Sequence, residues 1–359
     1  MNLSQHQKYM QRCLDLARLG AGRVAPNPLV GAVLVFQDRM IGEGYHQQYG
    51  GAHAEVHCIQ SVSNEDRQLI SSSTLYVSLE PCAHYGKTPP CADLLIHHKI
   101  PAVVVGCRDP FSEVNGKGIE KLLASGVKVY CGIMEEACRE LNKTFFCYHT
   151  LHRPFIVLKW AETADGFLAN LDQKEAQRLM ISNELSNRMV HQLRCNSMGI
   201  IVGRKTALLD DPRLNTRLWP GKDPVRMVFD PSLQLPAGLQ IFNGETSTIV
   251  FNYDKHSMEN VREDVHVNKV HYYQLGRNAE PVCQLVNGMY QAGLQSVLVE
   301  GGARLLQSFI DAGLWDEAMV IRNSNLYIQN GLPAPILQDH VYTRQQQYQK
   351  DIIQFYKRK

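Results

Sequence analysis

The chain has 359 residues, which at roughly 150 residues per domain predicts about two domains. Hydrophobic residues make up 44% of it and charged residues 20%, a composition that excludes collagen-like and largely disordered chains. Lys and Arg number 37 against 35 Asp and Glu, and apart from the final Lys357-Arg358-Lys359 there is no basic run. A non-specific nucleic-acid binder needs clustered positive charge, so that class is disfavoured.

The first eight residues lack the apolar core of a signal peptide. The longest apolar stretches, 29–36 and 101–106, are too short to span a bilayer. We therefore expect a cytoplasmic protein that binds no membrane. Eight of the ten cysteines precede residue 150, which favours a first domain over 1–150 and a second over 151–359, with thiolate chemistry in the first.

The first domain is predicted to alternate helices and strands. Ser4 and Gln7 form a capping-box pattern that opens the first helix, which ends near Gly20. Further helices are expected from about residue 53 and over 91–98, 119–125 and 135–146, with strands over 29–35, 40–45, 74–79, 102–105 and 127–131. This alternation predicts a mixed or parallel sheet with helices on both faces.

The alternation restarts after His152-Arg153-Pro154. Strands are expected over 155–160, 198–202, 225–229, 248–251, 296–300 and 317–321, and helices from a Ser182 cap to about Arg194 and from Gly301-Gly302 to Ala312. The halves share no internal repeat, so the fold class is α/β with two different domains. Residues 243–281 and the tail after Asn330 give no recognisable pattern.

The motif that carries the most chemistry is His53-Ala54-Glu55, followed by Pro81-Cys82 and by Cys91. One imidazole and two thiolates leave the fourth position of tetrahedral Zn²⁺ to water, the pattern of a catalytic zinc site. Zinc lowers the pKa of such a water to about 7, so that zinc hydroxide attacks, and Glu55 is the candidate proton shuttle. His53 and Glu55 can converge on one metal only near a helix start, and Pro89-Pro90 places Cys91 in a first helical turn, which helps to hold its thiolate ionised.

The alternatives are a closed structural zinc site, or buried free cysteines beside a surface histidine. The glutamate and the prolines fall where catalysis needs them, which favours the catalytic site. His-x-Glu with Pro-Cys-x-x-Cys is typical of zinc nucleobase deaminases, although eight residues rather than two separate Cys82 from Cys91 here. The other six cysteines of the first half are expected to be small core residues: Cys13, Cys58, Cys107, Cys131, Cys138 and Cys147.

Three segments resemble the bifunctional deaminase–reductases of riboflavin biosynthesis, and the long cysteine spacing separates that family from cytidine and tRNA-adenosine deaminases. The segments are Pro26-Asn27-Pro28-Leu29-Val30-Gly31, His53-Ala54-Glu55 and Glu80-Pro81-Cys82-Ala83-His84-Tyr85-Gly86-Lys87-Thr88-Pro89-Pro90-Cys91. The resemblance implies a cytidine-deaminase-like, three-layer α/β/α domain that deaminates a diaminopyrimidinone ribosyl phosphate at ring carbon 2. It also implies a substrate pocket lined by Asn27, His46, His84 and Lys87, with Lys87 as a candidate for the phosphate. The family's Asp-Pro-Asn-Pro segment is Asp109-Pro110-Phe111-Ser112 here, so Phe111 receives no role.

In the second half, 296–303 is a strand that leads through two glycines into a helix, which presents N–H groups to a phosphate. It is not the Gly-x-Gly-x-x-Gly fingerprint. Over 159–166, 202–212 and 300–302 the chain resembles the reductase half of the same family, which has a dihydrofolate-reductase-like α/β fold and uses NADPH. The resemblance implies cofactor contacts from Ala161, Thr206, Asp210, Gly302, Ala303, Arg304, Leu305 and Leu306. It implies substrate contacts from Lys159, Arg194, Leu214, Arg217 and Glu300, and the arginines suit a ribose phosphate.

Two segments depart from the family pattern. The stretch Lys174–Met180 is about three residues longer, so Met180 takes the cofactor position of a stacking Trp, and Asn323–Leu326 replaces a Pro-x-Leu-Gly turn. We therefore predict an enzyme with one Zn²⁺ per chain and NADPH that acts on a small pyrimidine ribosyl phosphate, deaminating it and then reducing its ribosyl group. A deaminase whose second domain cannot reduce, a nucleic-acid base deaminase and a zinc-stabilised binding module are the alternatives. A homo-oligomer remains open.

Overall fold

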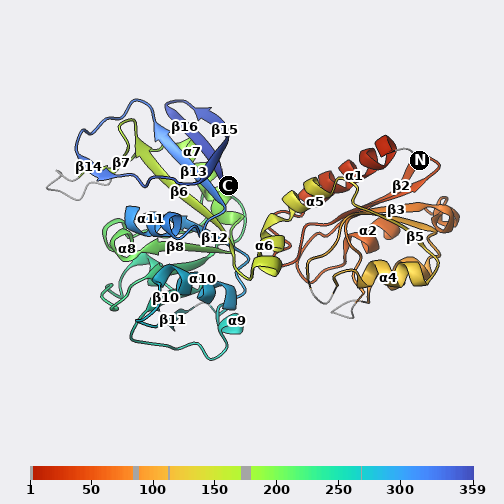
Figure 1. Ribbon diagram of the computed structural model, residues 1–359, viewed down its shortest axis with the longest axis horizontal. Coiled ribbons are helices and arrows are strands. Elements are labelled where there is room, and N and C mark those ends of the chain that lie inside the picture. The colour runs from red at the N-terminus through yellow and green to blue at the C-terminus, as the bar shows by residue number, and fades with distance from the viewer. Residues whose placement is uncertain (1–2, 84–88, 112–113, 171–178, 268) are drawn as a thin grey trace. The chain divides into compact units, whose positions relative to one another are not determined.

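A computed structural model divides the chain into two compact units, Met1–His152 and Arg153–Lys359 (Figure 1). The sequence-based boundary was at residue 150. The structure describes residues 3–83, 89–111, 114–170, 179–267 and 269–359. No helix in these ranges is long and apolar enough to cross a membrane.

The first unit is a five-stranded sheet between two layers of helices (Figure 1). The strands lie in the order β2-β1-β3-β4-β5: β2 (Arg39–Tyr45), β1 (Gly31–Phe36), β3 (Thr74–Leu79), β4 (Ala102–Cys107) and β5 (Lys128–Cys131). Strand β1 is antiparallel to β2 and β3, whereas β3, β4 and β5 run parallel. The sheet is therefore mixed, and Cys82 follows the carboxyl end of β3, one of its parallel strands.

The two faces of this sheet carry separate hydrophobic clusters. Helices α2 (Ala54–Gln60), α3 (Cys91–His97) and α4 (Lys117–Ala124) pack on one face, and α1 (Leu3–Arg18) and α5 (Glu135–Leu141) on the other. Because side chains alternate along a strand, β1 turns Leu34 to the first cluster and Val33 to the second. A Cβ on Gly44 would lie 2.3 Å from the backbone nitrogen of Cys58, so this glycine allows α2 to pack closely on β2.

The predicted single helix over 135–146 is wrong. The structure has two helices, α5 and α6 (Lys143–Leu151), separated at Asn142. The Asn142 side chain accepts a hydrogen bond from the Leu29 N–H (2.8 Å) and donates one to the Leu29 carbonyl (2.9 Å). The Asn142 side chain thus pairs both the N–H and the carbonyl of Leu29, and the helix is interrupted at Asn142. A short 3-10 helix, η1 (Arg67–Ser72), precedes β3.

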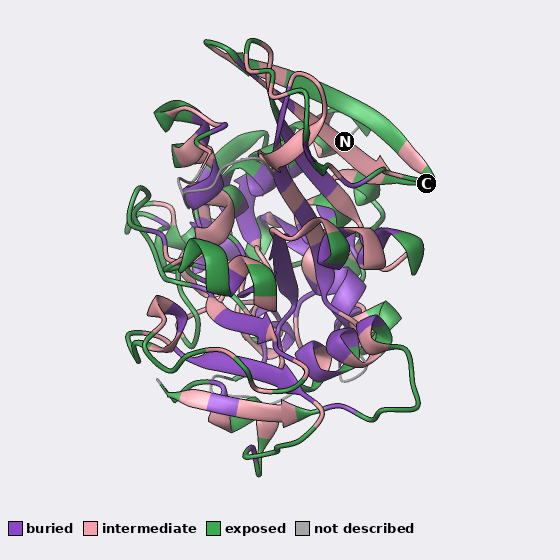
Figure 2. Ribbon diagram, turned by 90° about the vertical axis from the view of Figure 1, so that its left-hand side faces the viewer, coloured by how far each residue is buried: buried purple, intermediate pink, exposed green. Residues whose placement is uncertain are grey.

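The second unit is built on a nine-stranded sheet in the order β11-β10-β9-β8-β12-β6-β13-β16-β15. Its first seven strands in this order run parallel, and β16 and β15 form an antiparallel hairpin at the edge. The bounds are β6 (Phe155–Thr163), β8 (Gly199–Gly203), β9 (Val225–Phe229), β10 (Thr248–Asn252), β11 (Val270–Gln274), β12 (Ser296–Glu300), β13 (Glu317–Asn323), β15 (His340–Tyr348) and β16 (Asp351–Arg358). Figure 2 shows the middle strands buried and the edge strand β15 mostly exposed.

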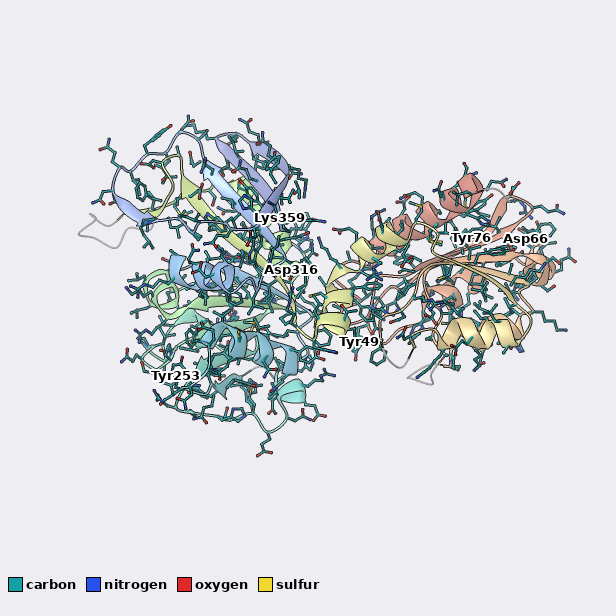
Figure 3. All side chains as sticks on the ribbon, in the orientation of Figure 1. Tyr49, Asp66, Tyr76, Tyr253, Asp316 and Lys359 are labelled. Carbon is teal, nitrogen blue, oxygen red and sulfur yellow. The ribbon has the colours of Figure 1, made fainter. Side chains whose placement is uncertain are left out.

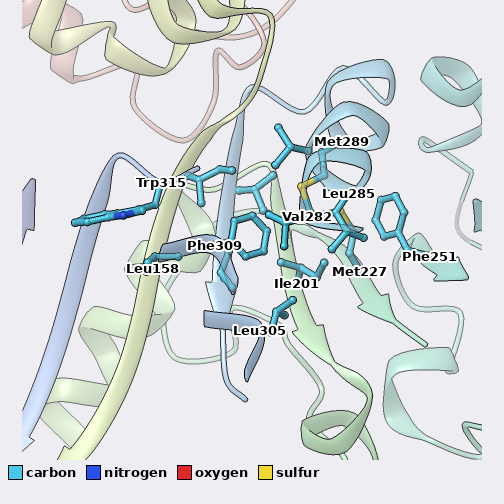
Figure 4. Packing of buried hydrophobic residues seen from close by; sticks show 14 of the residues in the cluster. Leu158, Ile201, Met227, Phe251, Val282, Leu285, Met289, Leu305, Phe309 and Trp315 are labelled. Carbon is cyan, nitrogen blue, oxygen red and sulfur yellow. The ribbon is translucent and has the colours of Figure 1, made fainter. Parts of the chain in front are cut away.

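Helices cover both faces of this sheet. Helices α10 (Pro281–Gln291) and α11 (Ala303–Asp311) pack on one face, where Met227, Phe251 and Phe309 join the largest cluster (Figure 4). Helices α7 (Glu184–Cys195) and α8 (Arg204–Asp210) contribute to clusters on the other face. The smaller elements are η2 (Gln240–Phe242), α9 (Val261–Asp264) and the two-stranded sheet of β7 (Phe167–Asn170) and β14 (Gly331–Pro333).

Asp316, which Figure 3 labels, forms hydrogen bonds at the amino end of β6. Both of its carboxylate oxygens accept hydrogen bonds from Arg153 at 2.7 Å, and one also accepts the Ile156 N–H at 2.7 Å. The predicted Ser182 cap of α7 is wrong, because the N-cap is Asn183, whose side chain accepts the Ser186 N–H. Ser182 instead donates to the Asn187 side chain (2.8 Å).

Candidate functional site

Three predicted metal ligands meet in the first unit. His53 immediately precedes α2, Cys82 follows β3, and Cys91 is the first residue of α3. The Nδ1 atom of His53 lies 3.3 Å from the Cys91 sulfur and 3.6 Å from the Cys82 sulfur, and the three ligand atoms lie within 4.8 Å of one another. A tetrahedral zinc site with ordinary bond lengths places nitrogen and sulfur ligands about 3.5 Å apart. The donor set and its spacing therefore fit Zn²⁺.

Hydrogen bonds around Cys82 favour its thiolate. The Cys91 thiol and His53 bond to the Cys82 sulfur, and the Cys91 backbone N–H lies 3.3 Å from it. These contacts hold the pKa of Cys82 well below its usual range. A thiolate is the form that binds a metal.

Glu55 lies in the first turn of α2, beside the three ligands. Its side chain is buried with 3% exposure, and it hydrogen-bonds to the Cys91 thiol. Burial, and then the Cys82 thiolate, raise the pKa of Glu55 to about 7. A carboxyl group with such a pKa can both accept and release a proton near neutrality, which is the property that a proton shuttle needs.

Asn27 and His46 lie next to this cluster. The His46 Nδ1 lies 3.0 Å from the Ala52 carbonyl, so it donates there, and Nε2 accepts from the Asn27 side-chain amide (3.0 Å). Burial lowers the pKa of His46, which keeps the ring neutral. The His46 and His53 rings meet edge-on with centroids 5.6 Å apart. The structure thus brings two predicted substrate residues to His53, one of the three candidate metal ligands, while His84 and Lys87 lie outside the described residues.

The buried carboxylate of Glu80 braces the loop that carries Cys82. One oxygen accepts the N–H groups of Gly118 (3.0 Å) and Ile119 (3.2 Å), and the other those of Gly116 (3.0 Å) and Asp109 (3.3 Å). Glu80 thereby caps α4, whose own N-cap residue offers no side-chain hydrogen bond. Glu80 is not among the predicted site residues, although its acidic side chain directly precedes Pro81-Cys82 in the sequence.

A cavity of about 400 Å³ opens in the second unit beside the carboxyl-terminal part of β6 and the end of β12. This is the edge at which parallel α/β sheets bind ligands. Seven residues predicted to bind substrate or cofactor line it: Lys159, Ala161, Met180, Arg194, Asp210, Arg217 and Glu300. Met180 stands at the rim with 64% of its surface exposed.

Arg194 and Glu300 form a buried ion pair in this cavity. The guanidinium donates to both carboxylate oxygens, at 2.8 and 2.7 Å, and to the Asn215 carbonyl at 3.1 Å. Burial acts to raise the pKa of Glu300, but Arg194 and Lys159 outweigh it and lower the pKa to about 2. Glu300 is therefore ionised at neutral pH.

The remaining predicted residues of the second unit lie outside the cavity lining. Thr206 packs against the Gly301-Gly302 turn, where a Cβ on Gly301 would lie 2.8 Å from the Thr206 methyl carbon and both glycines have positive φ (85° and 72°). Leu214 is only 2% exposed and belongs to the hydrophobic core. In the 302–306 turn, Arg304 is exposed, whereas Leu305 and Leu306 point into the core, so that their backbone alone can face a ligand.

His191 lines the same cavity and was not predicted. Burial, Arg194 and Arg217 lower the pKa of this imidazole to about 4, so it is neutral at physiological pH. It lies one turn before Arg194 on α7. The three-residue spacing on a helix would have placed the two side chains on one face.

These two sites define a two-domain enzyme with a zinc deaminase unit followed by a reductase-type unit. Residues 3–107 match the zinc-binding region of cytidine and deoxycytidylate deaminases, and residues 154–326 match the RibD C-terminal domain. The chain is 37% identical over 318 residues to the riboflavin biosynthesis protein RibD of Aquifex aeolicus, covering 88% of this chain and 85% of that protein. It is 32% identical over 331 residues to RibD of Escherichia coli, covering 88% and 87%.

Solved structures agree with these similarities. A diaminohydroxyphosphoribosylaminopyrimidine deaminase/5-amino-6-(5-phosphoribosylamino)uracil reductase from Thermotoga maritima has a TM-score of 0.86 at 32% identity and covers 99% of both chains. Acinetobacter baumannii RibD has a TM-score of 0.86 at 30% identity, also covering 99% of both. The chain belongs to the RibD family of riboflavin biosynthesis proteins.

Proposed function

We propose that this chain catalyses two consecutive steps of riboflavin biosynthesis. The first is hydrolytic deamination of 2,5-diamino-6-(5-phosphoribosylamino)pyrimidin-4-one, and the second is NADPH-dependent reduction of the product's ribosyl group to ribityl. The observation that carries the proposal is the His53, Cys82 and Cys91 cluster with Glu55 buried beside it. Family membership supports joining this site to a reductase in one chain.

In the first unit, His53, Cys82 and Cys91 are the proposed ligands of one Zn²⁺. When bound, the metal supplies the Lewis acidity that activates water at neutral pH. The Glu55 carboxylate accepts a proton from the attacking water and passes it toward the amino group, which leaves as ammonia. Asn27 and His46 bind the pyrimidine ring, and His84 and Lys87 are proposed to complete the pocket, with Lys87 at the phosphate.

In the second unit, the cavity is proposed to hold the ribosyl phosphate beside the cofactor. Lys159, Arg194 and Arg217 supply positive charge for the phosphate, and Glu300 offers an ionised acceptor for substrate hydroxyl or N–H groups. Leu214, which lies in the core, supports the loop that carries Arg217. NADPH supplies the hydride that converts ribosyl to ribityl.

The cofactor residues are proposed along one edge of the sheet. Ala161, Met180 and Asp210 line the cavity, and Thr206 packs on the Gly301-Gly302 turn. The backbone of the turn formed by Gly302, Ala303, Arg304, Leu305 and Leu306 is proposed to receive the cofactor phosphates.

The substrate is a small phosphorylated pyrimidine, and we infer that the enzyme works in the cytoplasm. Metal-binding thiolates at Cys82 and Cys91 need a compartment that keeps them reduced, which supports this location. A nucleic-acid substrate receives no support from the near-neutral charge.

Incubation of the native chain with the diaminopyrimidine phosphate tests the proposal. Without NADPH, the product mass should show the net replacement of one NH by O, which is the addition of water and the loss of ammonia. With NADPH, the mass should rise by two further hydrogens while NADPH absorbance falls. Deamination without any reduction would leave only the first half of the proposed function standing.

A further inference from the structure

NADPH differs from NADH by a phosphate on the 2′ oxygen of its adenosine ribose. A reductase that prefers NADPH therefore needs a cation at that end of the cofactor, whereas an acidic residue there favours NADH. Within the proposed reductase function, the cations that line the cavity, Lys159, Arg194 and Arg217, are assigned to the substrate phosphate, so the choice of NADPH needs another cation. That cation should lie where the adenosine ribose reaches the sheet edge.

The strand order indicates where the adenosine lies. The proposed cofactor residues follow neighbouring strands: Ala161 on β6, Gly302 after β12 and Thr206 after β8. The next strand in the same direction is β9. Adjacent strands are about 4.8 Å apart, so β6 and β9 are separated by roughly 14 Å along the edge. With the nicotinamide end at β6, the adenosine end of an extended dinucleotide falls at the ends of β8 and β9.

Two basic residues stand at this point. Arg204 and Lys205 directly follow β8. One nitrogen of the Arg204 guanidinium contacts the Ser232 hydroxyl (3.4 Å) and the Gln234 side-chain oxygen, both on the loop after β9. These partners are neutral, and in the part of the chain that the structure describes no carboxylate forms an ion pair with Arg204. Its charge is therefore available to an anion.

The acidic residue at the end of β9 does not oppose a phosphate here. Asp230 is buried, with 1% exposure, and one of its oxygens accepts the Leu235 N–H at 2.9 Å. One carboxylate oxygen of Asp230 is thus engaged within its own loop, and the side chain is covered from the solvent-facing edge where a phosphate would bind. That hydrogen bond shapes the 230–235 turn, which presents Ser232 and Gln234 to Arg204.

We propose that Arg204, assisted by Lys205 and Ser232, binds the 2′-phosphate of NADPH and sets the preference for NADPH over NADH. The guanidinium offers a fork of N–H donors to the phosphate oxygens, and Lys205 adds a second positive charge. Ser232 contributes a hydroxyl donor. This assignment rests on the proposed reductase function.

Nucleotide fragments test the site without turnover. The full chain is titrated calorimetrically with adenosine 2′,5′-bisphosphate and with 5′-AMP, as native protein and as Arg204→Ala, Ser232→Ala and Lys269→Ala. Lys269 precedes β11 at the opposite, amino edge of the sheet, so its variant controls for the loss of one positive charge. Arg204→Ala should weaken bisphosphate binding roughly tenfold or more, which is about 1.4 kcal/mol, and change AMP binding less than about twofold. Ser232→Ala should show a smaller loss, and Lys269→Ala none.

Steady-state rates separate this inference from the proposed function. With the deaminated substrate, Arg204→Ala should lower the ratio of kcat/KM for NADPH to that for NADH by a similar factor, and its deamination rate should stay native. A native chain that oxidises neither nucleotide would contradict the proposed function itself. A native chain that oxidises NADPH, with an unchanged nucleotide ratio in Arg204→Ala, would overturn only the role of Arg204. Inorganic phosphate that binds as tightly as the bisphosphate would also overturn it, because the site would then bind any phosphate.

Discussion

Glu55 lies against the metal-binding cluster without belonging to its three ligands. We therefore expect Glu55→Gln to retain one zinc per chain and to lose deamination by roughly 10²–10⁴-fold or more, because a positioned proton shuttle contributes about that much. Metal analysis and product mass measure the two properties separately. Cys82→Ala or Cys91→Ala should instead lose zinc and destabilise the first unit, because metal binding and folding are coupled. Loss of zinc in Glu55→Gln would show that Glu55 binds the metal, which would contradict its role as a proton shuttle.

Met180 tests how the cofactor stacks in the second unit. An aromatic ring stacked on the cofactor contributes about 0.5–1.5 kcal/mol beyond its buried area, and a methionine sulfur contact is of similar order. We expect Met180→Trp to bind NADPH at least as tightly as the native chain, with a gain of at most about tenfold. NADPH titration followed by fluorescence measures this, and abolished binding in Met180→Trp would mean that the rim residue is not at the nicotinamide.

Asp210 provides the complementary test, because it lines the cavity as a charged group. We expect Asp210→Ala to lose reduction, since a polar partner aimed at a bound ligand cannot be removed without leaving that ligand group unpaired. Deamination by the same protein should remain at the native rate. If Asp210→Ala binds and oxidises NADPH normally, the proposed nicotinamide pocket is misplaced.

The ion pair of Glu300 predicts a pH dependence of stability. Its pKa is lowered to about 2 in the folded chain, against about 4.3 in an unfolded one. A lowered carboxyl pKa stabilises the fold above about pH 4.3, and this contribution, of order 3 kcal/mol, is lost as the pH falls toward 2. Glu300→Gln should be less stable at pH 7 by about 3–5 kcal/mol, because Arg194 stays buried without its partner, and should show a smaller loss between pH 5 and 3.

Tryptophan fluorescence in urea can measure this selectively. The three tryptophans, Trp160, Trp219 and Trp315, all belong to the second unit. Their unfolding transition therefore reports on the unit that contains Glu300. An equal pH slope in the native and Glu300→Gln chains would show that the ion pair does not contribute.

At the scale of secondary-structure elements, the break between α5 and α6 lies at Asn142, whose side chain bonds to Leu29. Asn142→Ala removes both hydrogen bonds to Leu29 and leaves a backbone N–H and carbonyl without partners. We expect the first unit to lose about 2–4 kcal/mol of unfolding free energy. Because Leu29 closely follows Asn27, the KM for the diaminopyrimidine should rise more than kcat falls. Urea unfolding followed by circular dichroism tests the stability, and an unchanged tryptophan transition in the same samples is the control.

Elements with strong local signals were predictable from the sequence. The strands 74–79, 225–229 and 296–300 were predicted with the bounds that the structure has, since each is a short, mostly apolar and β-branched run between polar turns. The hairpin β15–β16 was not predictable in this way. Strand β15 lies at the sheet edge, mostly exposed, and its Gln345-Gln346-Gln347 run shows no alternation of polar and apolar residues. Helix α10 is not among the predicted helices, although it has a local signal: Pro281 at its start, followed by apolar residues at helical spacing, Val282, Leu285, Val286 and Met289.

Residues of the candidate sites also differ in whether a local sequence signal predicts them. Donor type and spacing are chemically restrictive, so the three candidate zinc ligands stood out in the sequence, and the structure brings them together. The pairing of Arg194 with Glu300, 106 residues apart, depends on the parallel sheet and could not be read from spacing. Leu214 is expected at the substrate from resemblance alone, and because its side chain packs in the core only its backbone could make that contact. Arg204 lies within the 202–212 segment that resembles the reductases, but its proposed role comes from the strand order and from its contacts, which spacing does not give.

The two units have separate hydrophobic clusters and separate candidate sites, which predicts two independent reactions in one chain. Glu55→Gln, which should not deaminate, should still reduce the deaminated compound at the native rate when it is supplied directly. Asp210→Ala should accumulate that same compound from the diaminopyrimidine, and mixing the two variants should restore the full conversion through free solution. Mass analysis of the three reactions decides the matter. A parallel fall of both activities in either variant would contradict independence, because it would require one site to depend on residues of the other.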